Sequence, residues 1–391
     1  MSAGFGVLAL IGAAGLLGPL LAARTAWHVP VVAGELAAGV LLGPTVSGLI
    51  RPADPTLSLL ADIGFALVMF VAGTQVPIRD ARIRPALRTG AARAAGVAVL
   101  AVLVAYAIAA GTGIPHAALY AVLLASSSAA LILPIVGALH LAGPAVLAML
   151  PQVALADAVC IVALPLVIDP ARAGSAALGS AAVLACSAVL YLILRRLNQR
   201  GLLRRAHRWS QRRKFALELR VNLTILFALA ALAMTTHVSI MLAGFCFGLV
   251  VGAIGEPRRL AKQLFSLTDG FLGPLFFVWL GASLDVRALA RHPTLILLGV
   301  ALGLGAVAVH AAMRLTGQPV PVALLSAAQL GVPVAAAALG AQTGLLRPGE
   351  PAAIVLGALL TIVIAVVAAG RLAARQPPPP PVPDHQVKLP G

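Results

Sequence analysis

Long apolar runs, each closed by charged residues, Gly or Pro, repeat along this chain of 391 residues. A helix needs about 20 apolar residues to cross a bilayer, and on that rule we expect thirteen membrane-spanning helices. The second and ninth are the weakest, because Gly and Pro interrupt the second and the ninth is short. The expected spans are 4–23, 30–50, 57–75, 91–111, 115–139, 145–168, 173–194, 216–235, 238–254, 265–283, 293–313, 320–345 and 352–374.

Composition supports an all-α polytopic membrane protein. Hydrophobic residues make up 61% of the chain and charged residues 10%, whereas soluble domains carry about 25% charged residues. The net charge is +16, yet 23 of the 28 Lys and Arg residues fall on alternate connections. Such a bias places the N-terminus outside and the C-terminus in the cytoplasm of a multi-pass cell-membrane protein. We expect the basic stretch Arg195–Arg220 to lie against anionic lipid. It has no nucleic-acid recognition fold around it.

Asp157 stands alone in an apolar stretch, QVALADAVCIVALPLVI, with no other charge until Asp169. A carboxylate in hydrocarbon is costly unless it meets water, a partner or a transported ion. Such a group can exchange a proton for a cation. The alternative is a protonated Asp157 that serves as a hydrogen-bonded packing residue.

Two expected spans are interrupted. The fifth contains Ser126–Ser128 followed by Pro134, and the twelfth contains Gln329, Gly331 and Pro333. Proline removes a helical donor, so we expect both helices to be broken at these prolines. Paired breaks at corresponding positions indicate inverted repeats, here spans 1–6 and 8–13. Two ordinary kinked helices are the alternative.

Four segments carry recognisable motifs: VPVVAGELAAGVLLGPTVSGL (29–49), LADIGFALVMFVAG (60–73), ASSSAALILPIV (125–136) and GFLGPLFFVWLGASLDV (270–286). They resemble the CPA2 branch of the monovalent cation:proton antiporters, which also holds the glutathione-gated potassium efflux proteins. The resemblance implies two inverted repeats with broken crossing helices, a homodimer, and Asp157 as the ion-binding carboxylate. The implied division is scaffold and dimerisation helices 1–77, transport core 86–168, linker helix 172–196, basic cytoplasmic loop 197–215, scaffold 216–285, transport core 292–375 and disordered Pro-rich tail 376–391.

The chain departs from this family's pattern at three places. Many relatives carry an acid or amide before the essential Asp, where this chain has Ala156, and a lysine where it has Gly305. The Gly-Glu that often follows the second break is Gly331-Val332. A simpler site with one carboxylate predicts electroneutral exchange of one proton for one cation.

The predicted function is therefore proton-coupled antiport of Na⁺ or K⁺ by alternating access. Asp157 binds the proton or the cation, and Ser127 and Ser128, with freed backbone carbonyls, supply oxygen ligands. The candidate auxiliary residues are Ser126, Gln329, Glu35 and His310. His310 is a substitute base or an ordinary histidine toward the cytoplasmic end of its span. Glu35 guides ions or stabilises broken backbone, and the same two roles apply to Asp62 and Asp269.

Two other functions use the same architecture: a coupled transporter of another solute, such as an organic anion, and a channel-like potassium efflux protein. Against the anion stands the expected lack of an Arg or Lys inside the transport core. We expect no enzyme, because no HExxH zinc pair is present. No cofactor is predicted.

Overall fold

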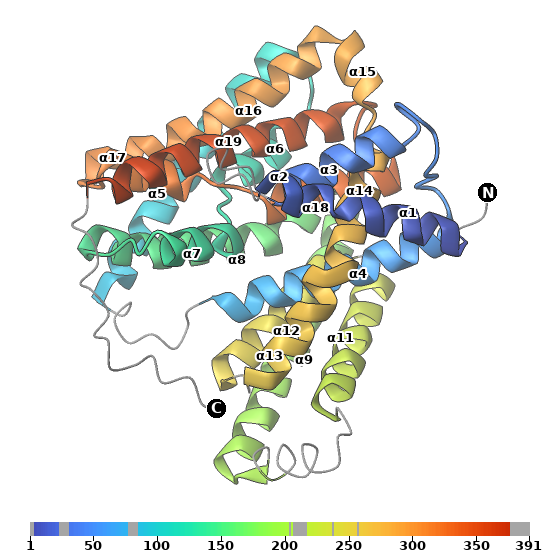
Figure 1. Cartoon of the computed structure of the whole chain (residues 1–391). Coiled ribbons are helices and arrows are strands. Elements are labelled where there is room, and N and C mark those ends of the chain that lie inside the picture. The colour runs from blue at the N-terminus through green and yellow to red at the C-terminus, as the bar shows by residue number, and fades with distance from the viewer. Residues whose placement is uncertain are drawn as a thin grey trace.

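Every regular element in the described part of the chain is a helix (Figure 1). The computed structural model describes residues 4–22, 31–76, 85–202, 205, 217–236, 238–255 and 258–375. Most of the predicted basic loop 197–215, and the whole tail 376–391, lie outside these residues. The helices are α1 (Phe5–Gly15), α2 (Leu17–Ala22), α3 (Val31–Leu42), α4 (Pro55–Gln75), α5 (Leu87–Thr112), α6 (Ala117–Ala125), α7 (Ala129–Ala138), α8 (Pro144–Ile168), η3 (Pro170–Arg172), α9 (Ala173–Gln199), α11 (Leu217–Thr235), α12 (Ile240–Ile254), α13 (Arg258–Leu267), η4 (Thr268–Leu272), α14 (Gly273–Ser283), α15 (Val286–Arg291), α16 (Pro293–Ala311), η5 (Ala312–Thr316), α17 (Val320–Ser326), α18 (Gly331–Thr343) and α19 (Glu350–Ala373).

Eleven helical segments of the described residues are long and apolar enough to cross a membrane. The expected second and ninth spans are shorter apolar helices, α3 with 12 residues and α12 with 15. The predicted count of thirteen is therefore not confirmed. Helix α3 stops ahead of Gly43 and Pro44, and residues 43–47 form turns. The apolar run 30–50 had suggested a longer helix.

The helices pack in pairs that repeat along the chain. Helix α3 packs on α14 and α4 on α12, while α5 packs on α8 and α16 on α19. The expected spans 2, 3, 4 and 6 (α3, α4, α5 and α8) correspond to spans 9, 10, 11 and 13 (α12, α14, α16 and α19), seven positions later. The contact of α3 with α14 therefore has its counterpart in the contact of α12 with α4. The contact of α5 with α8 has its counterpart in the contact of α16 with α19. The packing follows the pattern expected of two related halves.

Glycines bring the backbones of these pairs into contact. A Cβ on Gly39 of α3 would lie 2.1 Å from the Val278 carbonyl oxygen, and one on Gly248 of α12 would lie 2.1 Å from the Phe70 carbonyl oxygen. No side chain fits at either place. Small residues at such crossings let membrane helices associate by close van der Waals contact.

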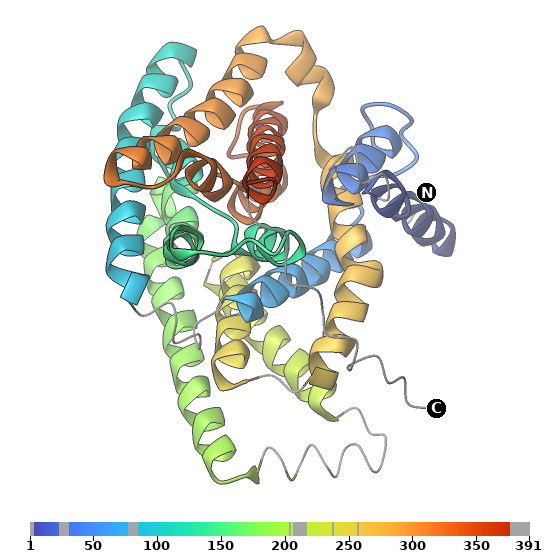
Figure 2. The ribbon, with the colours of Figure 1, turned by 60° about the vertical axis from the view of Figure 1, so that its left-hand side comes forward.

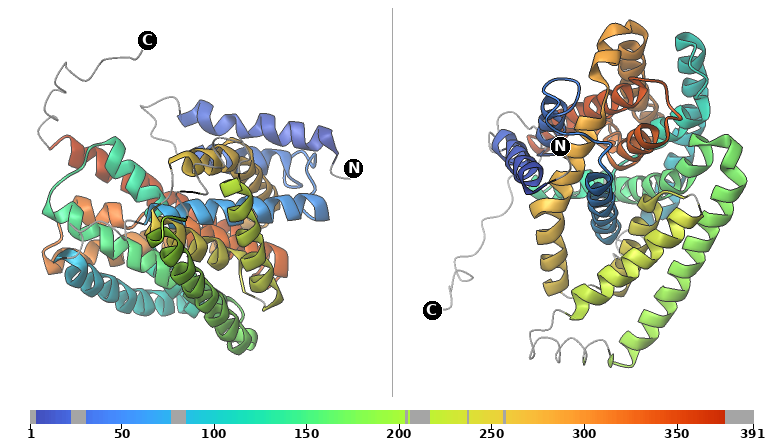
Figure 3. Two further views of the ribbon diagram at one scale, coloured as in Figure 1. Left: turned by 90° about the horizontal axis from the view of Figure 1, so that it is seen from below. Right: turned by 90° about the vertical axis from the view of Figure 1, so that its right-hand side faces the viewer.

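The middle of the bundle holds the broken helices. In Figure 1, α7 and α8 lie between α16 and α19 above and α4 and α12 below. Figure 2 and the right panel of Figure 3 show α9, in green, at the edge of the bundle. Asp157 lies in α8, on the side that faces α4, α14 and the start of α18.

Candidate functional site

The structure confirms two interrupted helices, but it corrects the cause of the first break. Helices α6 and α7 are separated by Ser126–Ser128, and α17 and α18 by residues 327–330. Pro134 lies inside α7 and not at the break. The serine segment is held by tertiary contacts instead. Pro333, in contrast, lies in the first turn of α18, where a missing N–H is tolerated at a helix start.

The two breaks bond to each other. The Ser127 hydroxyl donates to the Ser326 carbonyl oxygen at 2.8 Å. In return, the Gln329 side-chain amide donates to the Ser126 carbonyl oxygen at 3.0 Å and more weakly to that of Leu124 at 3.4 Å. Each break therefore satisfies carbonyl groups that the other leaves without helical partners. Backbone freed at membrane depth needs such partners.

Asp157 lies beside this crossing and is 3% exposed. Its Oδ2 accepts a hydrogen bond of 3.1 Å from the backbone N–H of Ala129, the first residue of α7. A helix N-terminus carries a partial positive charge and favours an anion. The break thus presents a backbone donor and a helix dipole to the carboxylate.

A cavity of about 30 Å³ opens next to the carboxyl group. Asp157 of α8, Ser128 of the first break and Gly331 at the start of α18 line it, and α4 and α14 close it with apolar side chains that include Met69 and Phe276. A space of about 10–15 Å³ already accepts one water molecule. The cavity can therefore hold a water molecule or a largely dehydrated monovalent ion against Asp157.

The predicted ligands separate into two groups. Ser128 lines the cavity with Asp157. Ser127 instead faces Ser326 and His310, and the hydroxyl of Ser126 donates to the Leu123 carbonyl oxygen at 2.8 Å. The carbonyl oxygens of Ser126 and Ser326 already accept hydrogen bonds from the opposite break.

His310 lies at the crossing of the breaks, where it is 1% exposed. Its Nε2 is 3.3 Å from the Ser127 Oγ and its Nδ1 is 2.9 Å from the Ala306 carbonyl oxygen. Because a carbonyl only accepts, Nδ1 carries the proton. Gly305, where relatives carry lysine, faces the apolar side chains of Leu124, Val104 and Ile108. His310 thus contacts Ser127 from a different face of α16.

The acids of α3 and α4 do not line the cavity. Glu35 is 3% exposed and lies within electrostatic range of Asp269. Asp62 accepts a hydrogen bond of 3.0 Å from the Gln342 amide, which connects α4 to the end of α18.

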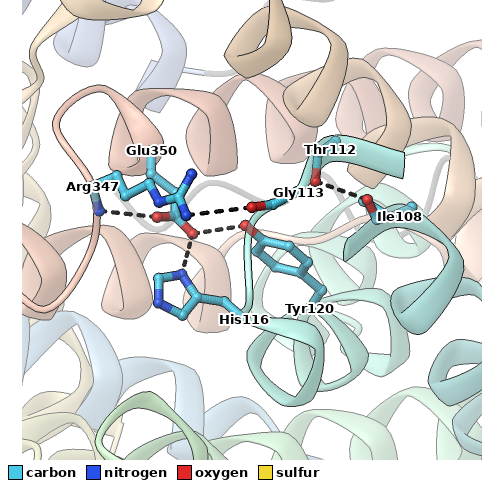
Figure 4. Close-up of polar contacts among 7 residues, drawn as sticks. All are labelled: Ile108, Thr112, Gly113, His116, Tyr120, Arg347 and Glu350. Atoms are coloured by element: carbon cyan, nitrogen blue, oxygen red, sulfur yellow. Dashed lines mark hydrogen bonds and ion pairs between the residues drawn. The ribbon is translucent and has the colours of Figure 1, made fainter. Parts of the chain in front are cut away.

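Figure 4 shows a polar cluster that the sequence did not predict. Glu350 is fully buried at the start of α19. Its Oε1 accepts from the Tyr120 hydroxyl and lies against the His116 Nδ1, both at 2.7 Å, and its Oε2 accepts from the Arg347 N–H at 3.0 Å. The cluster joins α6 to α19. No sequence motif marks this cluster, because His116 and Tyr120 lie more than 200 residues from Glu350 in the chain.

A second missed feature is Arg93, which is 7% exposed within α5. Its Nε donates to the Thr316 hydroxyl at 3.1 Å. The expectation that the predicted core spans hold no Arg or Lys was therefore wrong. Arg93 was missed because it lies near the start of the expected span 91–111, where it resembles a residue of the basic connection that precedes this span.

The chain is similar to known proteins over most of its length. The family model described as "Sodium/hydrogen exchanger, transmembrane" matches residues 8–374. A putative Na⁺/H⁺ antiporter, YjbQ of Bacillus subtilis, is 24% identical over 297 residues, covering 72% of this chain and 48% of its own length. The Na⁺/H⁺ antiporter NhaS4 of a Synechocystis species is 39% identical over 80 residues, 18% of this chain and 19% of that protein. The chain thus spans about half or less of the curated relatives it matches.

A solved structure shares the fold. The sodium proton antiporter MjNhaP1 from Methanocaldococcus jannaschii, at pH 8, superposes with a TM-score of 0.65 at 16% identity, over 93% of this chain and 97% of that one.

Proposed function

Because the chain belongs to the sodium/hydrogen exchanger family, we propose that it exchanges protons for a monovalent cation, Na⁺ or K⁺, across a cell membrane. Asp157 is the shared proton and cation site. The observation that carries the proposal is this buried carboxylate with the N-terminus of α7 on one side and a cavity of about 30 Å³ on the other. Intramembrane carboxylates in such surroundings are typical of transport pathways.

The site works by competition for one carboxylate. When Asp157 is ionised, the Ala129 N–H and the α7 dipole stabilise its charge, and a cation in the cavity meets its oxygens and the hydroxyl of Ser128. When Asp157 is protonated, the cation loses its main ligand. Proton and cation therefore exclude each other, which is the coupling that antiport requires.

The other parts of the proposal follow from the charge distribution and the resemblance. The N-terminus lies outside and the C-terminus in the cytoplasm. Helices α5–α8 and α16–α19 form the transport core, α1–α4 and α11–α14 form a scaffold that dimerises, and the basic loop lies against anionic lipid.

The decisive test is exchange by purified protein in liposomes with a pH gradient, challenged in turn with Na⁺, K⁺, Li⁺ and choline. We expect Asp157→Asn to abolish exchange and to leave folding intact, because the amide cannot cycle a proton. Asp157→Glu should keep weak activity with altered cation affinity. If the Asn variant retains pH-dependent exchange, Asp157 is not the shared site.

We also propose electroneutral exchange. With one carboxylate, the proton-loaded and cation-loaded sites carry the same charge. An electrogenic cycle would respond to an imposed potential, because moving one charge across 100 mV is worth about 2.3 kcal/mol. In proteoliposomes that transport Na⁺, a potassium–valinomycin potential of either sign should leave the rate and end-point unchanged. A shift that follows the sign of the potential would require a second proton carrier, with His310 the first to examine.

A further inference from the structure

Asp62 of α4 belongs to a stripe of side chains that leads to the ion cavity. Phe65 follows it by three residues, and Met69, which lines the cavity, follows it by seven. Residues at this spacing lie on one face of a helix. Seven residues span about 10.5 Å along the axis, so Asp62 is two turns from the cavity wall, toward the end at which α4 begins.

The hydrogen-bond partner of Asp62 belongs to a second helix that lines the cavity. The Asp62 Oδ1 accepts a hydrogen bond of 3.0 Å from the side-chain amide of Gln342, near the end of α18. The start of α18 lines the cavity with Gly331 and Val334. Asp62 therefore lies at a contact between α4 and α18, the two helices that also meet at the cavity.

An aromatic pair lies between Asp62 and the cavity. Phe65 stacks on Phe276 with the ring centroids 4.6 Å apart, and Phe276 is itself part of the cavity wall. Both side chains are buried. A cation that entered along this face of α4 would meet the carboxylate of Asp62 first and the aromatic pair second.

The carboxylate of Asp62 has room for a cation. The amide of Gln342 occupies one of its oxygens, and that hydrogen bond is exposed. In the part of the chain that the structure describes, no Lys, Arg or His forms an ion pair with Asp62. Carboxylate oxygens suit hard cations. Asp62 thus presents a negative charge that no neighbouring side chain balances.

We propose that Asp62 is the first binding station for the cation on the outer face, from which Na⁺ or K⁺ passes the Phe65–Phe276 pair to Asp157. The inference rests on the proposed function and its orientation, in which α4 begins outside. A unit charge about 4 Å away in water raises the local concentration of a monovalent cation about fivefold, and a charged entrance accelerates association. Asp62 therefore lowers the outer KM for the cation and leaves the rate at saturation unchanged.

The test is the dependence of exchange on Na⁺, and in parallel on K⁺, in right-side-out and inverted membrane vesicles. The main variant is Asp62→Asn, because asparagine keeps an oxygen for the Gln342 amide and loses the charge. At low ionic strength we expect it to raise the outer KM about fivefold, with the inner KM and the saturated rate unchanged. Added choline chloride should raise the wild-type outer KM toward that of Asp62→Asn, because salt screens exposed charges.

Two controls separate the charge from the hydrogen bond and from the general surface charge. Gln342→Leu removes the hydrogen bond and keeps the charge, so it should not raise the outer KM. Asp285→Asn removes another exposed carboxylate, which caps α15 by accepting from the Ala288 N–H at 2.8 Å. Asparagine caps a helix equally well, so this variant should leave both KM values unchanged.

Four results would overturn the inference. The first is an unchanged outer KM in folded Asp62→Asn. The second is an equal rise of that KM in Gln342→Leu, which indicates that the hydrogen bond matters and the charge does not. The third is an equal rise in Asp285→Asn, which indicates a general effect of surface charge. The fourth is a wild-type outer KM that does not respond to choline chloride, a measurement that needs no variant to fold. A wild type that exchanges no cation for protons overturns the proposed function itself, whereas the four results leave that function standing.

Discussion

Gln329 tests whether a polar residue at the crossing binds the ion or holds the two breaks together. Its amide donates to the carbonyl oxygens of Ser126 and Leu124, and it is 4% exposed. The substitution Gln329→Leu keeps the side-chain volume and removes both hydrogen bonds. The Ser126 carbonyl then stays buried without this donor.

The magnitude follows from these contacts. The 3.0 Å hydrogen bond contributes about 1 kcal/mol, the 3.4 Å contact less, and a buried carbonyl left without a partner costs about 1–3 kcal/mol. The apolar side chain of leucine returns about 1 kcal/mol by burial. We therefore expect a net loss of about 1–3 kcal/mol in the free energy of unfolding.

The assay is the thermal unfolding midpoint of purified protein in detergent, with and without Na⁺, together with the Na⁺ dependence of exchange. Gln342→Leu is the control, because that amide is exposed and makes one hydrogen bond to Asp62. Gln329→Leu should unfold at a clearly lower temperature without Na⁺, and the folded protein should bind Na⁺ with little change in affinity. An unchanged midpoint with weakened Na⁺ binding would refute this reasoning and make Gln329 a ligand.

Two further predictions use the same measurements. Ser128→Ala should weaken the apparent cation affinity several-fold, because Ser128 lines the cavity. Ser127→Ala should mainly lower the unfolding midpoint, because the Ser127 hydroxyl donates to the Ser326 carbonyl oxygen. Equal losses of cation affinity in both variants would contradict these separate roles of Ser128 and Ser127. Glu350→Gln should destabilise the protein by about 2 kcal/mol, because three donors meet that carboxylate, and should leave the half-maximal pH of exchange unchanged. A Glu350→Gln variant as stable as the wild type would show that the cluster does not hold α6 to α19.

The sequence predicted that Asp157 would lie near two interrupted helices, as it does in the structure, because these signals are local. A lone carboxylate in an apolar run and two interrupted helices are visible without any structure. The position of the first break was not predictable from Pro134. Ser127 fixes that break through Ser326, about 200 residues away. The prediction of Ser127 as a cation ligand has the same weakness. The hydrogen bond that holds Ser127 away from the cavity is to a residue distant in the sequence.

Buried charges outside the centre were missed for a related reason. Glu350 and Arg93 both lie near the ends of apolar runs, where a charged residue usually reaches water or lipid headgroups. Their burial depends on donors and acceptors from distant segments, Tyr120 for Glu350 and Thr316 for Arg93. A hydropathy pattern describes how apolar a segment is and does not identify the partner of a charge at its end.

The geometry around Asp157 also constrains how the proposed exchange proceeds. Met69 of α4 and Phe276 of α14 wall the cavity, and neither side chain offers an oxygen to a cation. If Asp157 is to meet water from both sides of the membrane, as antiport requires, this apolar wall has to move relative to α7, α8 and α18. The hydrogen bond between Asp62 of α4 and Gln342 of α18 crosses the same boundary, so it must break whenever the boundary slides by a helical turn. Because this hydrogen bond is exposed, breaking it costs about 1 kcal/mol or less. The hydrogen bonds between the two breaks lie on one side of the boundary and need not be broken.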